Sequence, residues 1–424
     1  MRTRVVILGG GFGGLSAVRR LRGAPVSVTL VDRTNHYLFQ PLLYQVATGV
    51  LSPADIAMPT RFLLRKQQNA EVLLADVNGI DLRRHVVQAD DGRFELPFDF
   101  LIVATGARHS YFNHPEWEAI APGLKTLDDA RRIRRRFLLA LEQAEKTTDP
   151  VAQQALLTFV VIGGGPTGVE LAGILPTIAR KGFSRDFRRI DPARVRILLL
   201  EGGPRLLASF PESLSTRAFT DLQSLGVECR TNAKVTRLTE EAVYIGDERI
   251  DTRTVFWAAG NAASPLVASM GAPMERTGRA LVQPDLSLPG DPNVFVVGDA
   301  AAVPLLTEST HYVPALAAAA NQMGEHAARM IIRTLAGQPR APFRYRDKGT
   351  LAVIGRGRAI ADFGRIRLTG MIAFLTWFFV HLLYLAGFRN RVSAMVQWVY
   401  SYVTYRPSAR LITDEDRKMG SGLI

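Results

Sequence analysis

The chain has 424 residues, a formal net charge of +13 and 47% hydrophobic residues. This length exceeds what one hydrophobic core organises and indicates two or three domains. The single cysteine, Cys229, excludes a disulfide within the chain and a redox-active cysteine pair. We interpret Cys229 as a small core residue.

The positive charge is concentrated near the C-terminus. Between Arg340 and Arg410 there are twelve Lys or Arg residues and two acids, interleaved with the most apolar part of the chain. Basic and apolar residues together favour an anionic membrane surface as the partner, so we expect no binding of nucleic acid. At the other end, Met1 to Arg4 lead directly into a predicted strand, and we expect no signal peptide.

A glycine-rich turn follows the first predicted strand. Gly9, Gly11 and Gly14 have the spacing of a dinucleotide-binding turn, which brings a pyrophosphate close to the backbone and to a helix N-terminus. A second apolar strand, Val26 to Val31, ends in Asp32, whose carboxylate can accept hydrogen bonds from a ribose. The alternative is a glycine-rich hairpin with a surface aspartate, but the strand–turn–helix context favours the dinucleotide site.

The glycine pattern occurs a second time. Gly163, Gly165 and Gly168 follow another apolar strand, and a second acid, Glu201, ends the strand after that. Two copies of the unit predict two nucleotide sites. The carboxylate at Glu201 repels a 2′-phosphate and favours NADH over NADPH, although the nearby Arg205 leaves NADPH open.

The elements between and after these turns are predicted from local patterns. We expect a loop at His36–Gly49, a hairpin at Val86–Leu96, a strand at Phe98–Gly106, a helix at Thr126–Lys146 capped by Asp128 or Asp129, a basic insertion at Arg180–Ala193, short strands at Val235–Ile250, strands at Thr254–Gly260 and Val294–Asp299, and a helix at Pro314–Leu335.

The C-terminal region differs from the rest. Met371 to Phe388 contain no Asp, Glu, Lys or Arg over eighteen residues, which is the lower limit for a membrane-spanning helix. A second aromatic stretch, Met395 to Tyr405, follows. Because basic residues flank the apolar run on both sides, we favour a helical hairpin lying on a membrane face. A spanning helix and a soluble dimer interface remain the alternatives.

These motifs together resemble those of one family. The chain looks like the type II NADH dehydrogenases, the single-subunit NADH:quinone oxidoreductases that do not pump protons, within the flavoproteins that have two dinucleotide-binding domains. The resemblance extends from Arg4 to about Ile412. Its most specific pieces are Gly163–Glu170 (GGGPTGVE), Trp257–Gly260 (WAAG), Val297–Ala300 (VGDA) and Gly387–Arg391 (GFRNR).

The resemblance implies an α/β fold with two Rossmann-like domains, one for FAD and one for NADH, and a C-terminal helical membrane-anchoring region. Residues 1–120 and 287–345 would form the FAD-binding domain. Residues 121–286 would form the inserted NADH-binding domain, and residues 346–424 the membrane-associating region.

The resemblance also assigns site residues. Those for FAD are Gly9, Gly10, Gly11, Phe12, Gly13, Gly14, Asp32, Arg33, Val77, Thr105, Gly106, Gly298, Asp299 and Ala317. Those for NADH are Gly163, Gly165, Gly168, Glu201 and Gly260. Glu170 and Gln322 would act in catalysis at the nicotinamide and quinone, and no metal is expected.

The sequence departs from the family at one place. Many members carry A-Q-x-A-x-Q where this chain has Ala317 to Gln322 (AAAANQ), so that Ala318 replaces the first glutamine. The acceptor is expected to be a membrane quinone, with ubiquinone and menaquinone both open. The sequence has no row of intramembrane carboxylates, so we expect no proton pumping.

The resemblance further implies a homodimer bound peripherally at the cytoplasmic face of the cell membrane. Two other functions remain as alternatives. One is a soluble-type NAD(P)H-dependent flavoprotein reductase, and the other is a redox-sensing flavoprotein that responds to NADH.

Overall fold

A computed structural model describes residues 2–183, 186–305, 308–405 and 409–412. The chain divides into two compact units. Unit 1 comprises Met1–Leu38, Met58–Arg108 and Asn261–Lys348, and unit 2 comprises Phe39–Ala57, His109–Gly260 and Gly349–Ile424. The chain crosses between the units at these boundaries, whereas the predicted functional domains have limits at residues 120, 286 and 345.

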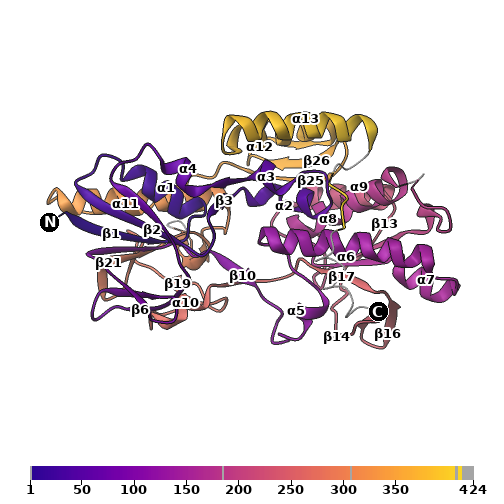
Figure 1. Ribbon diagram of the computed structural model, residues 1–424, viewed down its shortest axis with the longest axis horizontal. Helices are drawn as coiled ribbons and strands as arrows, with labels where there is room; N and C mark the ends of the chain where they lie inside the picture. Colours follow the sequence, from indigo (N-terminus) through magenta and orange to yellow (C-terminus); the bar gives the residue numbers. More distant parts are fainter. Residues whose placement is uncertain (1, 184–185, 306–307, 406–408, 413–424) are drawn as a thin grey trace. The chain divides into compact units, whose positions relative to one another are not determined.

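A six-stranded sheet forms the core of unit 1, in the order β20-β21-β9-β1-β2-β5 (Figure 1). All neighbouring strands are parallel except β20, which runs antiparallel to β21. The strands are β1 (Thr3–Leu8), β2 (Val26–Asp32), β5 (Ala70–Leu74), β9 (Phe100–Val103), β20 (Ser287–Leu288) and β21 (Asp291–Val296). All four residues of β9 are buried, as expected for a parallel strand covered on both faces.

Two helices of unit 1 pack closely on one another, α1 (Phe12–Arg20) and α11 (Ala317–Leu335). A Cβ added to Gly324 on α11 would lie 2.0 Å from the carbonyl oxygen of Gly13 on α1, so this approach requires glycine. The predicted hairpin at Val86–Leu96 is confirmed as part of a three-stranded meander, β6 to β8.

The remaining elements of unit 1, or at its boundaries, are short. They are β3 (His36–Leu38), β4 (Ala57–Pro59), α4 (Thr60–Leu64), β6 (Val77–Asp81), β7 (Val86–Ala89), β8 (Phe94–Pro97), β10 (Ala107–His109), β18 (Asn261–Ala263), α10 (Pro265–Ser269), β19 (Ala280–Leu281), η4 (Gly298–Ala300), β22 (Ala301–Ala302), β23 (Pro304–Leu305) and β24 (Glu308–Tyr312).

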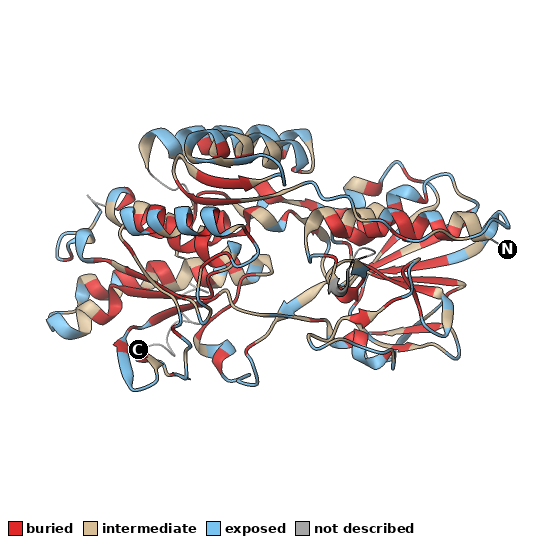
Figure 2. Cartoon of the chain, turned by 180° about the vertical axis from the view of Figure 1, so that it is seen from behind, coloured by how far each residue is buried: buried red, intermediate tan, exposed pale blue. Residues whose placement is uncertain are grey.

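Unit 2 is built on a four-stranded parallel sheet, in the order β13-β12-β11-β17. The strands are β11 (Thr158–Ile162), β12 (Arg196–Leu200), β13 (Val227–Arg230) and β17 (Thr254–Trp257). The helices are α5 (Trp117–Ile120), α6 (Leu127–Lys146), α7 (Pro150–Leu156), α8 (Pro166–Thr177) and α9 (Glu212–Ser224). Figure 2 shows that burial is concentrated in the strands of both sheets.

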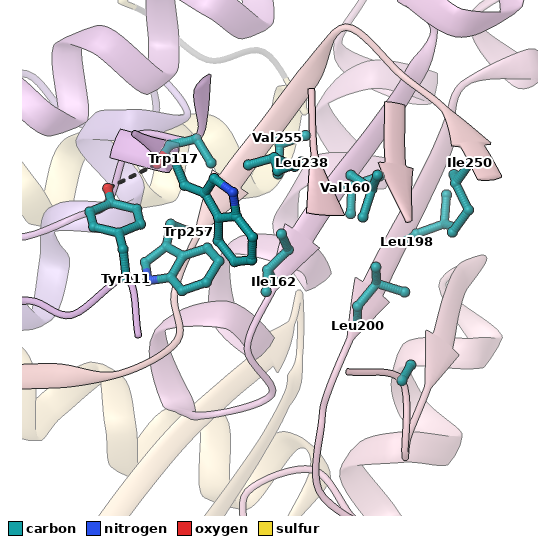
Figure 3. Close-up of a cluster of buried hydrophobic side chains, with 13 residues drawn as sticks. Tyr111, Trp117, Val160, Ile162, Leu198, Leu200, Leu238, Ile250, Val255 and Trp257 are labelled. Carbon is teal, nitrogen blue, oxygen red and sulfur yellow. Dashed lines mark hydrogen bonds between the residues drawn. The ribbon is translucent and has the colours of Figure 1, made fainter. Parts of the chain in front are cut away.

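An aromatic group packs at one side of the unit 2 sheet (Figure 3). Tyr111 and Trp117 surround Trp257 at ring-centroid distances of 5.0 and 5.6 Å. Two polar atoms of this group have backbone partners: the Tyr111 hydroxyl donates to the Ala121 carbonyl at 2.9 Å, and the indole N–H of Trp257 donates to the Ser110 carbonyl at 3.0 Å. These contacts give the group a structural role.

Three local predictions for unit 2 are corrected or refined. Helix α6 is capped by Thr126 and not by an aspartate: the Thr126 hydroxyl accepts from the Asp129 N–H at 3.1 Å, and the Asp129 carboxylate accepts from the Thr126 N–H at 2.8 Å. This reciprocal capping box satisfies two backbone donors at once. The predicted insertion at Arg180–Ala193 contains the last three residues of a π-helical turn, η2 (Ile178–Gly182), and the first two residues of η3 (Pro192–Arg194).

The predicted loop at His36–Gly49 is wrong in part, because β3 is followed by η1 (Gln40–Leu42) and by the helix α2 (Leu43–Ala47). A further short helix, α3 (Pro53–Ile56), begins at Ser52. The short strands predicted at Val235–Ile250 are confirmed as β14 (Arg237–Leu238), β15 (Ala242–Ile245) and β16 (Glu248–Asp251).

The C-terminal part of unit 2 forms a small antiparallel sheet and two helices. These are β25 (Thr350–Gly355), β26 (Arg358–Asp362), β27 (Arg367–Thr369), α12 (Gly370–Tyr384) and α13 (Phe388–Thr404). The apolar run predicted from the sequence does not form one helix, because α12 ends before Leu385 and Gly387 has a φ of +84°. Among the described residues, no helix combines the length and apolar character needed to cross a membrane.

Candidate functional site

The first glycine turn connects β1 to α1 in unit 1. Gly9 has a φ of +98°, and a Cβ there would lie 2.4 Å from the Ala104 carbonyl oxygen. A Cβ on Gly14 would lie 1.8 Å from the Gly9 carbonyl oxygen, so neither position accepts a side chain. Gly11 faces open space, with no atom within 4 Å of an added Cβ. The turn therefore leaves one face of its backbone accessible to a ligand.

Asp32 fixes this turn from the end of β2. One carboxylate oxygen accepts from the Gly10 N–H at 2.5 Å, and the other accepts from the Thr34 N–H at 2.6 Å. Arg33 beside it is exposed, and Phe12 packs edge-to-face on Tyr37 with ring centroids 5.5 Å apart. The carboxylate predicted to meet a ribose is thus held at the same end of the sheet as the turn.

Other predicted residues of unit 1 lie on turns next to these strands. Gly106 and Gly298 have φ values of +66° and +68°, and Asp299 lies in the turn η4. The Thr105 hydroxyl is buried without a hydrogen-bond partner. An unsatisfied buried hydroxyl beside an open glycine turn fits the presence of a polar ligand such as FAD. Val77 starts β6, and Ala317 begins helix α11.

Gln322 is engaged by the backbone of its own unit. Its amide N–H donates to the Arg346 carbonyl at 2.9 Å and to the Ala318 carbonyl at 3.2 Å, and its amide oxygen accepts from the Arg346 N–H at 3.0 Å. Both amide donors are therefore in use. In this arrangement the side chain anchors the segment that leads into the C-terminal region.

The second glycine turn connects β11 to α8 in unit 2 and repeats the geometry of the first. Gly163 has a φ of +109°, and a Cβ on Gly168 would lie 1.8 Å from the Gly163 carbonyl oxygen. Gly165 again faces open space. The Glu201 carboxylate accepts from the Gly164 N–H at 2.6 Å and from the Gly203 N–H at 2.7 Å.

Arg205 and Gly260 are two further residues considered for this second site. The guanidinium of Arg205 donates to the carbonyls of Phe210 and Ala208 at 2.7 and 2.8 Å, which occupies the cation that could have favoured a 2′-phosphate. Gly260, with a φ of +73°, lies where the chain returns to unit 1. A Cβ on Gly260 would contact the ring of Phe112 at 2.7 Å.

Glu170 lies in the first half of α8, two residues after the last glycine of the turn. The loss of water around its carboxyl raises the pKa of Glu170 to about 8, and a hydrogen bond from the Val353 N–H at 3.4 Å opposes this rise. A carboxyl with such a pKa exchanges its proton near neutral pH, which suits a group that handles protons.

The sequence prediction missed a group of buried polar side chains in unit 2. Tyr44 and Gln45 on α2 and Trp398 on α13 are buried and hydrogen-bonded to one another. The only signal in the sequence was the Tyr-Gln pair in an otherwise apolar stretch. A polar pair of this kind can be interpreted only when its partners are known.

Comparison with known proteins defines the class. Residues 3–324 match the family described as pyridine nucleotide-disulphide oxidoreductase, and residues 348–407 match the NDH2 C-terminal domain. The chain therefore belongs to the pyridine nucleotide-disulphide oxidoreductase family, which confirms the predicted fold class and the prediction of an oxidoreductase.

Individual relatives narrow this class. The chain is 42% identical over 98% of its length to the type II NADH:quinone oxidoreductase Ndh of Mycobacterium tuberculosis, covering 91% of that protein. It is 30% identical over 94% of its length to the demethylphylloquinone reductase NdbB of a Synechocystis strain, covering 96% of that protein. The chain belongs to the type II NADH:quinone oxidoreductases, as the resemblance predicted.

A solved structure agrees at the level of the fold. The structure of NDH2 from Plasmodium falciparum in complex with NADH has a TM-score of 0.88 with this chain. It covers 96% of this chain, and the chain covers 100% of it, at 21% identity. The C-terminal sheet and helices thus belong to the shared fold.

Proposed function

We propose that the chain is a membrane-associated, FAD-dependent NADH:quinone oxidoreductase that does not pump protons. The observation that carries this proposal is the pair of glycine turns, each held by its own carboxylate, in a chain whose full-length relatives are named NADH:quinone oxidoreductases. When bound, FAD would supply the two-electron chemistry that links oxidation of NADH to reduction of the quinone.

The residues of unit 1 would bind FAD. The first turn of α1 presents backbone N–H groups and the positive end of the helix dipole to a pyrophosphate that approaches over Gly11. Asp32 holds the turn through Gly10 and keeps a carboxylate near the ribose position. Asp299 and the buried Thr105 hydroxyl would supply further polar contacts.

The residues of unit 2 would bind NADH. Gly165 leaves its face of the turn open for the pyrophosphate, and Glu201 favours a free 2′-hydroxyl over a 2′-phosphate. Glu170 would border the nicotinamide and the quinone, where its proton is exchangeable near neutral pH. Because the amide N–H groups and the amide oxygen of Gln322 are all engaged, this residue would border the quinone site by holding the backbone of Arg346 in place.

This activity predicts a simple experiment. The purified full chain is expected to retain flavin, visible as a yellow colour, and to oxidise NADH only when a quinone is added. A colourless protein that binds no flavin would exclude the proposal. Binding of NADH without turnover on a soluble quinone would instead favour the alternative of a redox-sensing flavoprotein.

The membrane partner is proposed from an exposed apolar face on α12 and α13. Large apolar side chains recur every three or four residues on one side of each helix, and they are Ile372, Leu375, Phe379 and Leu383 on α12 and Phe388, Val392, Val396, Val399 and Val403 on α13. Phe388 is 82% exposed and Leu383 is 66% exposed. With arginines at both ends, this face suits insertion into the headgroup region of an anionic bilayer.

Binding to lipid vesicles tests this proposal. Phe379→Glu and Val399→Glu should each reduce sedimentation with phosphatidylglycerol vesicles by at least about tenfold, because a carboxylate would enter the apolar boundary. Val151→Glu is the matched control, because Val151 is 73% exposed on α7, outside the apolar face. Equal binding of all three variants would exclude this face as the membrane contact. Loss of a dimer without loss of vesicle binding would assign the face to subunit contact.

The predicted homodimer, the cytoplasmic location and the division into FAD- and NADH-binding domains remain predictions that this proposal includes.

A further inference from the structure

One side of helix α9 in unit 2 carries a row of polar side chains. They repeat every three or four residues along the helix and therefore share one face, and they are Ser213, Thr216, Arg217, Thr220, Asp221 and Ser224. Helix α9 packs against β26 of the C-terminal sheet (Figure 1), and Arg358 of that strand lies beside the same face. These residues line a groove of about 530 Å³.

The buried residue Asp221 holds both arginines of the groove in place. Asp221 is 5% exposed, and one of its carboxylate oxygens accepts from the Nε–H of Arg217 at 2.9 Å. Its backbone carbonyl accepts from Nη1 of Arg358 at 3.2 Å, and its other carboxylate oxygen lies 3.9 Å from the same nitrogen. The Ser224 hydroxyl also accepts from Nη1 of Arg358 and donates to the Asp221 carbonyl at 2.7 Å. Each guanidinium is thus fixed through one nitrogen.

The other nitrogens of these two guanidiniums are available to a ligand. Within the part of the chain that the structure describes, no group accepts from Nη1 or Nη2 of Arg217, or from Nε or Nη2 of Arg358. The Thr216 hydroxyl likewise has no hydrogen-bond partner among these residues. The side chains of Arg217 and Arg358 are 47% and 35% exposed, so a ligand in the groove can reach them.

The charge and the donors of the groove select an anion. The lining contains two guanidiniums and one carboxylate, and that carboxylate already faces the arginines. A guanidinium presents its N–H groups in a planar fork that matches the oxygens of a phosphate, and a hydroxyl adds a further donor. The groove is much larger than one phosphate and lies within the range of small-molecule sites, about 300–1,000 Å³. A phosphate carried by a larger polar molecule therefore fits it.

We propose that the groove between α9 and β26 binds a phosphate group through Arg217 and Arg358, with a further contact from the Thr216 hydroxyl. The phosphate belongs either to a soluble phosphate ester or to a lipid headgroup. The second source is near, because a Cβ on Gly357, the residue before Arg358, would lie 2.9 Å from Cε of Met371 in the first turn of α12. The groove shares no residue with either glycine turn, so this site is additional to the proposed function.

Calorimetric titration of the full chain with inorganic phosphate tests this site. FAD and NAD⁺ are kept at saturating concentrations to occupy the glycine turns, and the ionic strength is held constant with sodium chloride. Arg217→Gln and Arg358→Gln should each weaken phosphate binding by at least about tenfold, because each removes charge-assisted hydrogen bonds. Thr216→Val should weaken it by about two- to tenfold, because it removes one neutral hydrogen bond.

Arg237→Gln is the matched control. Arg237 is an exposed arginine on β14 of the same unit, where its guanidinium lies over the ring of Tyr244, outside the groove. The substitution removes the same charge and should leave the phosphate affinity unchanged. Arg217 and Arg358 contact a buried aspartate, whereas Thr216→Val leaves those contacts intact. If the arginine variants do not fold, the Thr216→Val titration decides.

Vesicles separate the two sources of the phosphate. If the ligand is a lipid headgroup, Arg358→Gln and added inorganic phosphate should each reduce sedimentation with phosphatidylglycerol vesicles at constant ionic strength, whereas Arg237→Gln should not. If the groove variants lose phosphate affinity and sediment with vesicles like the unmodified chain, the ligand is a soluble phosphate ester. Either result supports the site.

Three results would overturn the inference. They are no measurable binding of phosphate by the unmodified chain, an unchanged affinity in every groove variant that folds, and an equal loss of affinity in Arg237→Gln. None of these measurements requires turnover. Absence of NADH:quinone activity would instead overturn the proposed function and leave the phosphate site to be judged by the titrations.

Discussion

The two glycine turns have the same backbone geometry and different surroundings. In both, the last glycine is fixed by a carbonyl oxygen 1.8 Å from where a Cβ would lie, and a carboxylate accepts from the N–H of the second glycine at 2.5 or 2.6 Å. Helix α1 then packs on α11, whereas α8 packs on β25, where a Cβ on Gly173 would lie 1.7 Å from the Ile354 carbonyl oxygen.

The difference lies at one equivalent position. Counting from the first glycine of each turn, Ser16 in unit 1 corresponds to Glu170 in unit 2. Ser16 donates to the Asn321 side chain at 2.9 Å and joins two helices. At the equivalent position of α8, Glu170 carries a carboxyl with a pKa near 8. The shared backbone geometry of the two turns sets where a nucleotide would bind. The residue at the position of Ser16 or Glu170 sets which chemistry is available beside that nucleotide.

The largest expected effect tests whether each turn serves its own nucleotide. Gly14→Ala forces a Cβ against the Gly9 carbonyl, and overpacking of this kind costs about 1–3 kcal/mol or more. We expect the purified variant to lose its flavin. Gly168→Ala makes the same clash in unit 2, and it should retain flavin while the KM for NADH rises at least about tenfold.

Flavin absorbance after gel filtration and steady-state kinetics measure these two outcomes. Gly11→Ala is the control for folding, because its Cβ would meet no protein atom within 4 Å. It should unfold like the unmodified chain and release flavin more readily. Loss of flavin in Gly168→Ala with an unchanged KM for NADH would contradict the assignment of the two turns.

A smaller effect is expected from the carboxylates that hold the turns. Glu201→Gln weakens two charge-assisted hydrogen bonds, each worth about 1.5–3 kcal/mol, and should raise the KM for NADH about 10- to 100-fold. Asp32→Asn should weaken flavin retention and leave the KM for NADH near its normal value. Titration of flavin content against added FAD separates the two variants. An effect of Glu201→Gln on flavin content alone would show that the turns are not independent.

The next prediction uses the pKa difference at the equivalent position. Folded Glu170 keeps its proton up to about pH 8, whereas its ordinary pKa is 4.5. Between these values the folded state binds more protons than the unfolded state. The free energy of unfolding should therefore fall as pH rises from about 4.5 to about 8, by at most about 1.4 kcal/mol per pH unit. The stabilisation that Glu170 contributes is fully present below about pH 4.5.

Glu170→Gln removes this slope, because glutamine does not titrate. Urea denaturation should give similar stabilities for the variant and the unmodified chain near about pH 5, and a more stable variant near about pH 8. Ser16→Ala is the matched control in unit 1, expected to lose about 1 kcal/mol at every pH. Parallel curves for Glu170→Gln and the unmodified chain would mean that Glu170 ionises normally.

The smallest effect concerns Cys229, which has no cysteine counterpart in unit 1. Burial raises the pKa of its thiol to about 12, so very little thiolate exists at neutral pH. Cys229→Ala should leave quinone reduction unchanged and alter stability by about 1 kcal/mol or less. Alkylation of the native chain by iodoacetamide should be slow, and rapid alkylation with loss of activity would contradict this interpretation.

Both glycine turns could be predicted because their signals are local. Positive φ values at Gly9 and Gly163 require glycine whatever surrounds them. The acids that hold the turns lie at the end of the next strand or directly after it. The prediction failed where local signals compete. Asp128 and Asp129 suggested a cap for α6, but the earlier Thr126 starts the helix because threonine and aspartate satisfy each other's backbone.

The amino-acid sequence by itself determined the two turns, their carboxylates, the apolar C-terminal region and the family, since each depends on residue type and short spacing. Only the tertiary structure decided that the Gln322 amide is hydrogen-bonded to the backbone of Arg346. It also decided that the Trp398 indole donates to Gln45, which lies 353 residues away in the sequence. A buried polar side chain takes its role from its hydrogen-bond partners. Folding brings those partners together from distant parts of the chain.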